Sequence, residues 1–169
     1  MKIQYKLIKN FLPKEKFKPL KECMIGNIKN KSNVDFPWYL NLTVSGKKEK
    51  DGIYFIHLFY HLNQINSSFF NYLEPILEII KPKSILRIKG NLYPKLNKIV
   101  RHGNHVDYDY SHKGLIFYIN SNNGYTILNN KIKIKSIENS ALFFDPGITH
   151  CSTTCSDKDF RCNINFNYL

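Results

Sequence analysis

The sequence predicts a single β-rich α+β domain, in which short strands form a sandwich or barrel and helices pack on the outside of a sheet. The second half of the chain is a succession of short apolar runs separated by turn residues. The first half contains two stretches with apolar residues at helical spacing. The chain has 169 residues, of which 43% are hydrophobic. That is enough for one core and too little for two large domains.

The two helical stretches lie on either side of an extended segment. The first follows Pro13, and its apolar positions are Phe17, Leu20 and Met24. The second covers residues 67–80, where Pro75 interrupts the pattern and predicts a kink or a restart. Residues 35–60 are rich in aromatic and β-branched side chains, which are typical of strand and loop.

From residue 84 onward we expect seven or eight short strands. Their sequences are SILRIKGNLY, HVDYDY, GLIFYIN, GYTIL, KIKIKSI, ALFFDP and RCNINFNY. Strict alternation of lysine and isoleucine over residues 131–135 predicts a half-buried strand with a solvated lysine face. No linker or internal repeat separates the two halves. We therefore expect one domain over residues 1–169, with 1–83 as scaffold and 84–169 as the strand-rich core.

The net charge of +12 is weak evidence for a nucleic-acid partner. The chain contains 22 lysines, 20 asparagines and 21 isoleucines, but only 3 arginines. An AT-rich genome produces this bias without selection for a basic surface, and the lysines are scattered along the chain.

The sequence shows no signal for secretion or membrane insertion. It has no apolar stretch of 18 residues, and its first residues lack the apolar segment of a signal peptide. We therefore expect a cytoplasmic protein, in a bacterium or a phage-infected host cell, with reduced cysteines and no membrane partner. The spacing of Cys151, Cys155 and Cys162 matches no zinc-binding pattern.

A candidate metal site begins at His105-Val106-Asp107. In an extended strand the side chains of His105 and Asp107 point to the same face. His150 follows a turn at residues 145–147. Two histidines and one carboxylate can bind one face of Fe(II) and leave the other positions open. The alternatives are ordinary histidines that bind no metal, or Asp109 as the carboxylate ligand.

Arg161 begins the terminal strand and gives the candidate site a second element. By alternation Arg161 shares one face with three asparagines at 163, 165 and 167, while the opposite face is apolar and would pack against the helices. An arginine inside a barrel is costly unless an anion pairs with it. Its guanidinium suits a carboxylate.

Other histidines and aromatic residues favour structural roles. His57 and His61 are four apart, which would suit a metal on a helix, but their surroundings indicate a strand. Packing or substrate contact is therefore expected there. His102 and His112 flank the motif, and we expect them near the entrance of the site. Core positions are expected at Trp38 and Tyr39.

The order His105-x-Asp107, His150, Arg161 resembles the motif of the Fe(II)- and 2-oxoglutarate-dependent dioxygenases. The Tyr-Pro pair at 93–94 precedes it as in prolyl 4-hydroxylases. The whole chain resembles the compact prolyl 4-hydroxylase-like oxygenases of phages and marine bacteria. The resemblance implies a double-stranded β-helix, a cupin-like jelly-roll barrel, with the N-terminal helices on the outside of one sheet.

The resemblance also implies roles for individual residues. It implies that Fe(II) is bound by His105, Asp107 and His150. It implies that 2-oxoglutarate pairs with Arg161 and contacts Tyr118, Tyr93, Asn91 and Asn163. Ascorbate is the expected reductant.

The resemblance implies a hydroxylase of an unactivated C–H bond, with a prolyl residue in a peptide or protein as the expected target. One alternative is an oxidative dealkylase of nucleic acid, of the AlkB type, because Asn91-x-Tyr93 and Arg161-x-Asn163 are similar there too. Those enzymes have a second arginine where this chain has Asn167. The other alternative is a non-catalytic, cupin-like binding module. The sequence leaves the oligomeric state open.

Overall fold

The structure is a computed structural model that describes residues 4–26, 35–44 and 52–169. Its main element is an eight-stranded antiparallel sheet with the order β1-β9-β6-β11-β5-β3-β2, in which β4 pairs with β3. A second, three-stranded sheet has the order β10-β7-β8. The larger sheet consists of β1 (Tyr5–Lys9), β2 (Tyr39–Asn41), β3 (Tyr54–His61), β4 (Gln64–Ile65), β5 (Ile85–Pro94), β6 (Lys113–Tyr118), β9 (Ser140–Phe144) and β11 (Phe160–Tyr168). The smaller sheet consists of β7 (Tyr125–Leu128), β8 (Ile132–Lys135) and β10 (His150–Ser152).

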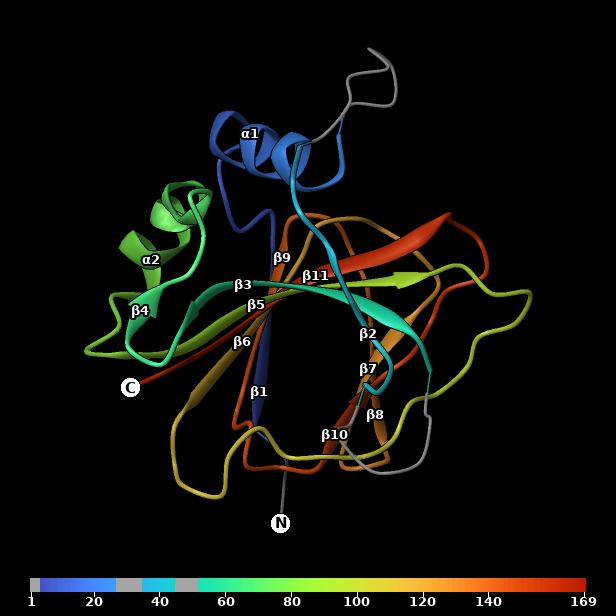
Figure 1. The fold of residues 1–169 in the computed structure, drawn as a ribbon. Coiled ribbons are helices and arrows are strands. Elements are labelled where there is room, and N and C mark those ends of the chain that lie inside the picture. Colours follow the sequence, from blue (N-terminus) through green and yellow to red (C-terminus); the bar gives the residue numbers. More distant parts are fainter. Residues whose placement is uncertain (1–3, 27–34, 45–51) are drawn as a thin grey trace.

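Both helices pack on one face of the larger sheet (Figure 1). α1 (Lys14–Ile25) buries the three apolar residues that its spacing predicted, and α2 (Glu74–Ile80) buries Ile76. A short 3-10 helix, η2 (Phe70–Leu73), leads directly into α2. The predicted interruption near Pro75 is therefore a restart, with the proline in the first turn of the new helix, where its missing N–H costs nothing.

The smaller sheet covers the opposite face of the larger one (Figure 1). A separate apolar cluster joins β6 and β9 to β7 and β8. Its buried members are Ile116, Tyr118, Leu128, Ile134, Leu142 and Phe144. The two sheets therefore enclose an interior that is lined partly by this cluster and partly by polar side chains.

β11 lies in the middle of the larger sheet, between β5 and β6, and has the predicted alternation. Its apolar side chains belong to the core under the helices: Cys162, Ile164, Phe166 and Tyr168. Arg161 and the asparagines on the other face are buried on the interior side. Because of this alternation, β11 presents polar side chains to the barrel interior and apolar side chains to the core beneath the helices.

Two local predictions are wrong. HVDYDY is not a strand, because only His105 makes an isolated bridge and the segment is otherwise loop. Tyr39 is not a core residue, since it lies on the edge strand β2 with 61% of its surface exposed. Trp38 is packed against the core as expected, and its indole N–H donates to the carbonyl of Met24.

Neither of the described helices has the length and apolar character needed to cross a membrane.

Candidate active site

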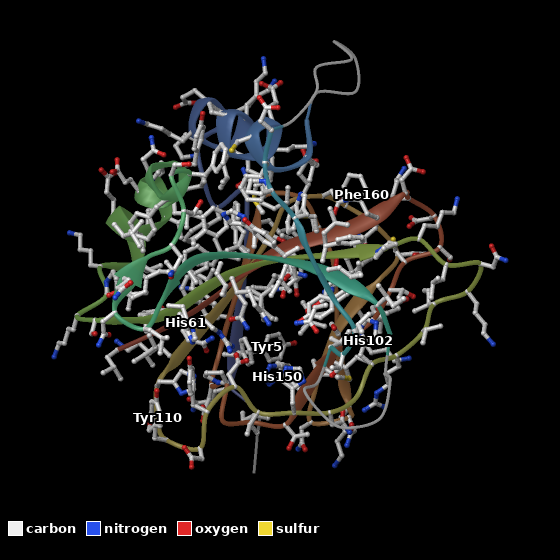
Figure 2. The ribbon with its side chains drawn as sticks, in the orientation of Figure 1. Tyr5, His61, His102, Tyr110, His150 and Phe160 are labelled. Atoms are coloured by element: carbon white, nitrogen blue, oxygen red, sulfur yellow. The ribbon has the colours of Figure 1, made fainter. Side chains whose placement is uncertain are left out.

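The three predicted metal ligands come together in the interior of the barrel. One ligand atom from each of His105, Asp107 and His150 lies within 4.8 Å of the other two. Backbone hydrogen bonds of 2.9 Å in both directions join His105 to His150, so the loop before β6 is fixed against β10. The amide of Asp107 donates to the carbonyl of Pro146 at 3.2 Å. Figure 2 shows His150 inside the barrel.

Backbone carbonyls set the orientation of both imidazoles. His150 Nδ1 lies 2.9 Å from the carbonyl oxygen of Ile148, and His105 Nδ1 lies 3.4 Å from that of Gly103. Because a carbonyl can only accept, each Nδ1 carries a proton, and Nε2 is the ring nitrogen left to bind a metal. Burial and the neighbouring His150 lower the pKa of His105 to about 4. His105 is therefore neutral at physiological pH, as a metal ligand must be.

Asp107 is held by two side chains on the strands beneath it. Arg87 Nη2 donates to Oδ1 at 2.8 Å, and Asn165 Nδ2 donates to Oδ2 at 3.0 Å. Burial acts to raise the pKa of Asp107, but the charges of His150 and Arg87 and the Asn165 hydrogen bond outweigh it, so the pKa lies below its usual value. The carboxylate is therefore ionised and fixed in direction.

A second layer of hydrogen bonds supports this carboxylate. His112 Nδ1 donates to the carbonyl of Tyr110 at 2.8 Å, so its Nε2 must accept. The Asn167 amide nitrogen donates to that Nε2 at 2.9 Å and to Asp107 Oδ2 at 3.1 Å, while its oxygen accepts from Arg87 at 3.2 Å. His112 is therefore a buried support of the site, and the prediction that it lies at the entrance is wrong.

Beside the three candidate ligands lies a pocket with about 440 Å³ of empty space, including its open mouth. Arg161 lines this pocket and is fully buried. Its Nε donates to Ser136 Oγ at 2.8 Å, and its Nη2 donates to Thr126 Oγ1 at 3.0 Å. Its Nη1 has no hydrogen-bond partner among the described residues. A buried N–H of a cation without an acceptor is expensive, so this group is suited to an anionic ligand.

The four remaining predicted contacts surround Arg161. Tyr93, Asn91 and Asn163 line the pocket, and Asn91 donates to Asn163 at 3.1 Å. The guanidinium lies 5.3 Å from the centre of the Tyr93 ring. Tyr118 lies behind the pocket wall: its hydroxyl donates to Thr126 Oγ1 at 2.8 Å, and its ring centre is 5.9 Å from the guanidinium. The structure thus places Tyr118 against Arg161 and its partner Thr126.

His102 is also buried, which contradicts its predicted place near the entrance. Its ring stacks on Tyr93 with a centroid distance of 5.1 Å, and its Nδ1 lies 2.8 Å from Ser152 Oγ. His102 therefore fixes the pocket wall beside β10.

These residues fit a divalent iron ion and a dicarboxylate cosubstrate. Two imidazoles and one carboxylate converge and leave one side open, which is the donor set of non-haem Fe(II) sites. In the same pocket, Nη1 of Arg161, which has no partner among the described residues, is available to a carboxylate. Asp109 is exposed and lies outside the cluster, so Asp107 is the carboxylate of this site.

His57, one of the two histidines at four-residue spacing, belongs to the packing. His57 is buried among aromatic rings, and its Nδ1 lies 2.7 Å from the carbonyl oxygen of Pro37. Burial lowers the pKa of His57. Among the described residues, no cysteine belongs to a cluster that could hold a metal.

Four polar residues of the site were not predicted from the sequence. Arg87 and Lys89 precede the predicted contacts Asn91 and Tyr93 on β5, at the same two-residue spacing. That alternation was a signal that could have identified them. Thr126 and Ser136 hold Arg161, and no local pattern marks them because they reach it only through the pairing of the sheets.

No protein-family model matches the sequence, and no curated protein matches it. Solved structures do match. A prolyl 4-hydroxylase from Pseudomonas putida has a TM-score of 0.60 and 13% identity over 98% of this chain and 92% of that chain. A prolyl hydroxylase from Trichoplax adhaerens, in complex with a hypoxia inducible factor peptide, has a TM-score of 0.61 and 13% identity over 98% of this chain and 83% of that chain. The epimerase SnoN, in complex with Fe3+, alpha ketoglutarate and nogalamycin RO, has a TM-score of 0.67 and 10% identity over 99% of this chain and 79% of that chain.

These similarities show the fold. The chain has the double-stranded β-helix of the 2-oxoglutarate-dependent oxygenases, and the predicted fold class is confirmed.

Proposed function

We propose that the protein is an Fe(II)- and 2-oxoglutarate-dependent oxygenase. The single observation that supports this most strongly is the pairing of two features in one pocket. His105, Asp107 and His150 converge at one place, and the buried Arg161 presents an unpaired N–H at another. The fold is the one in which enzymes of this class are found, and the iron and 2-oxoglutarate in the SnoN structure agree with this proposal.

The residues of the chain bind and orient the reactants. His105, Asp107 and His150 would hold the iron, and Arg161 would hold the distal carboxylate of 2-oxoglutarate. Tyr118 fixes Thr126 and thereby the direction of the Arg161 guanidinium. Tyr93, Asn91 and Asn163 line the pocket and would contact the cosubstrate. The bound iron and cosubstrate supply the oxidising power: 2-oxoglutarate and O2 yield succinate and CO2, and one oxygen atom enters a C–H bond of the substrate.

The proposed substrate is a prolyl residue in a peptide or protein. Two of the similar structures are prolyl hydroxylases, and one of these is bound to a peptide. The segment of residues 108–113 directly follows Asp107 in the sequence and would border the substrate. The epimerase among the similar structures shows that the fold also accepts other substrates, so the experiment must compare substrate classes.

The test is 2-oxoglutarate turnover, followed as succinate, with Fe(II) and with ascorbate as reductant. Proline-containing peptides and alkylated oligonucleotides are added in separate reactions. We expect peptides to stimulate turnover. The turnover of Asp107→Ala should be at least about 100-fold lower than that of the wild type. Asp109→Ala is the matched control, because this carboxylate is two residues away and exposed, and it should retain activity.

The experiment tests the substrate class, the enzymatic activity and the metal ligand separately. Stimulation by oligonucleotides alone, with formaldehyde release, would replace the prolyl substrate by a dealkylation substrate. Absence of any turnover in the wild type would contradict the enzymatic proposal. Equal losses in the Asp107 and Asp109 variants would contradict the metal assignment.

A further inference from the structure

A second cation, Lys89, lines the same pocket. It lies on β5 with Asn91 and Tyr93 at two-residue spacing, and all three line the pocket. Across the ladder Lys89 is paired with Asn165, whose amide donates to the metal-binding carboxylate Asp107. The backbone of Lys89 is thus at the register of the strand position that supports Asp107, and the charge of Lys89 interacts with both Asp107 and His105.

No described carboxylate lies within 4.0 Å of this ammonium group. Lys89 Nζ donates to the hydroxyl of Tyr54 at 3.4 Å and lies 5.6 Å from the centre of the Tyr54 ring. Asp107, the nearest described acid that affects it, is already paired with Arg87 and Asn165. Burial, with a contribution from Arg87, lowers the pKa of Lys89 to about 8. The group remains mainly cationic at neutral pH, and no carboxylate of the described residues forms an ion pair with it.

Among the described residues, the ammonium group of Lys89 hydrogen-bonds only to the Tyr54 hydroxyl, which is neutral and leaves the charge uncompensated. The pocket is therefore the place where its counter-ion would bind. The two arginines nearby have defined partners: Arg87 pairs with Asp107, and Arg161, which also lines the pocket, is held by Ser136 and Thr126.

The backbone positions of Lys89 and Arg161 lie at different registers of the barrel. On β5 the residue opposite Arg161 is Tyr93, four residues from Lys89, so these backbone positions are about 13 Å apart along the strand. A five-carbon diacid that pairs with Arg161 at one end and with the iron at the other uses both of its carboxylates in those contacts, so Lys89 can bind a carboxylate of another molecule.

We propose that Lys89 binds a carboxylate of the molecule that is oxidised, so that the substrate is acidic near the carbon that reacts. This inference rests on the proposed oxygenase function and narrows its substrate class. The carboxylate can be the C-terminal acid of the reacting residue or the side chain of an acidic neighbour, and both have the same chemistry.

The test measures binding, using full-length protein loaded with Mn(II), which supports no turnover. The protein is first titrated with 2-oxoglutarate by calorimetry. The saturated complex is then titrated with two acid and amide pairs. One pair is N-acetyl-L-proline and N-acetyl-L-prolinamide; the other is the N-acetylated Pro-Glu and Pro-Gln dipeptide amides. Wild type is compared with Lys89→Met and with Lys95→Met, an exposed lysine beyond the pocket.

We expect at least one acid to bind wild type about 10-fold more tightly than its amide, as charge-assisted hydrogen bonds do. The pair that shows the difference identifies the source of the carboxylate. Lys89→Met should lose the difference, Lys95→Met should keep it, and 2-oxoglutarate should bind all three proteins alike.

Three results would overturn the inference while leaving the proposed function intact. These are acids that bind no better than amides to the wild type, a preference that survives in Lys89→Met, and a selective loss of 2-oxoglutarate binding in that variant. The last result would assign Lys89 to the cosubstrate. Failure of the wild type to bind 2-oxoglutarate in the first titration would instead contradict the proposed function.

Discussion

Arginine is rare in this chain, and its positions are informative. Two of the three arginines, Arg87 and Arg161, are in the candidate site, although lysine is about seven times as common in the sequence. Arg87 binds a carboxylate and an amide oxygen together, and Arg161 spans two hydroxyls while presenting a third N–H. A lysine offers a point charge and could not fix several acceptors in one plane.

Lys89 gives a prediction at the level of a single residue. The pKa of Lys89 is lowered to about 8, against about 10.4 in an unfolded chain. Below pH 8 the buried, protonated lysine therefore destabilises the folded state by its full amount. Between about pH 8 and 10.4 Lys89 is protonated in the unfolded chain but largely neutral in the folded protein, so this destabilisation decreases as the pH rises. Lys89→Met should therefore stabilise the metal-free protein at pH 7 by about 1–3 kcal/mol.

Urea unfolding at pH 7 and pH 10 measures this effect. The gain should shrink at the higher pH, and Lys95→Met should show no gain at either. A destabilised Lys89→Met at pH 7 would mean that the lysine supports the fold.

The separate residues of the site differ in how far the sequence could predict them. His105, Asp107, His150 and Arg161 follow from spacing and from a family resemblance, and the structure places them together. Arg87 could not be connected with Asp107 from the sequence, because the contact depends on the loop after β5 folding back over that strand.

At the level of elements, strands were predicted well where apolar and polar residues alternate. β5, β6, β7, β8, β9 and β11 were all identified. The segment HVDYDY has the same alternation but is loop, because its side chains reach inward to the metal site and to Arg87 instead of forming a ladder. β1 and β10 were not predicted as strands. Each is short, and each is defined by its pairing with a distant strand.

The turn before β7 limits the position of Arg161. A Cβ atom at Gly124 would lie 2.7 Å from Arg161 Cδ and 2.7 Å from the backbone oxygen of Thr154. Backbone cannot move aside cheaply, so Gly124→Ala should displace the arginine. We expect at least about 10-fold weaker 2-oxoglutarate binding and a loss of about 1–3 kcal/mol in stability.

The control for this variant is Gly90→Ala on the helix side of β5. There the added Cβ would meet only side chains, at 3.3–3.4 Å. Calorimetric titration with 2-oxoglutarate should show a clear loss for Gly124→Ala and little change for Gly90→Ala. Equal affinities in both variants would show that the turn does not control Arg161.

In the whole molecule, the two halves of the sequence form one sheet. β1 pairs with β9, and β3 pairs with β5, so residues 1–83 contribute both flanks of the strand-rich core. The helices cover the apolar side chains of β11 and β6. The proposal of a single domain over the whole chain follows from this pairing, since neither half has a closed core of its own.

A fragment of residues 84–169 should therefore fail to fold. Without β3 and the helices, β5 becomes an exposed edge and the apolar face of β11 is open to water. Circular dichroism and amide proton NMR dispersion should show an unfolded or aggregated fragment, whereas the full chain should unfold in one cooperative transition. A well-dispersed spectrum of the fragment would contradict the single-domain proposal.

The most direct test of the proposed metal and cosubstrate site is spectroscopic. Under anaerobic conditions, Fe(II) and 2-oxoglutarate are added to the protein, and the visible charge-transfer absorption of the chelated cosubstrate is recorded. We predict this absorption in the wild type and in Asp109→Ala, no absorption in Asp107→Ala, and a much higher 2-oxoglutarate requirement in Arg161→Ala. A wild-type protein without the absorption, or an Asp107→Ala variant that keeps it, would contradict the site described above.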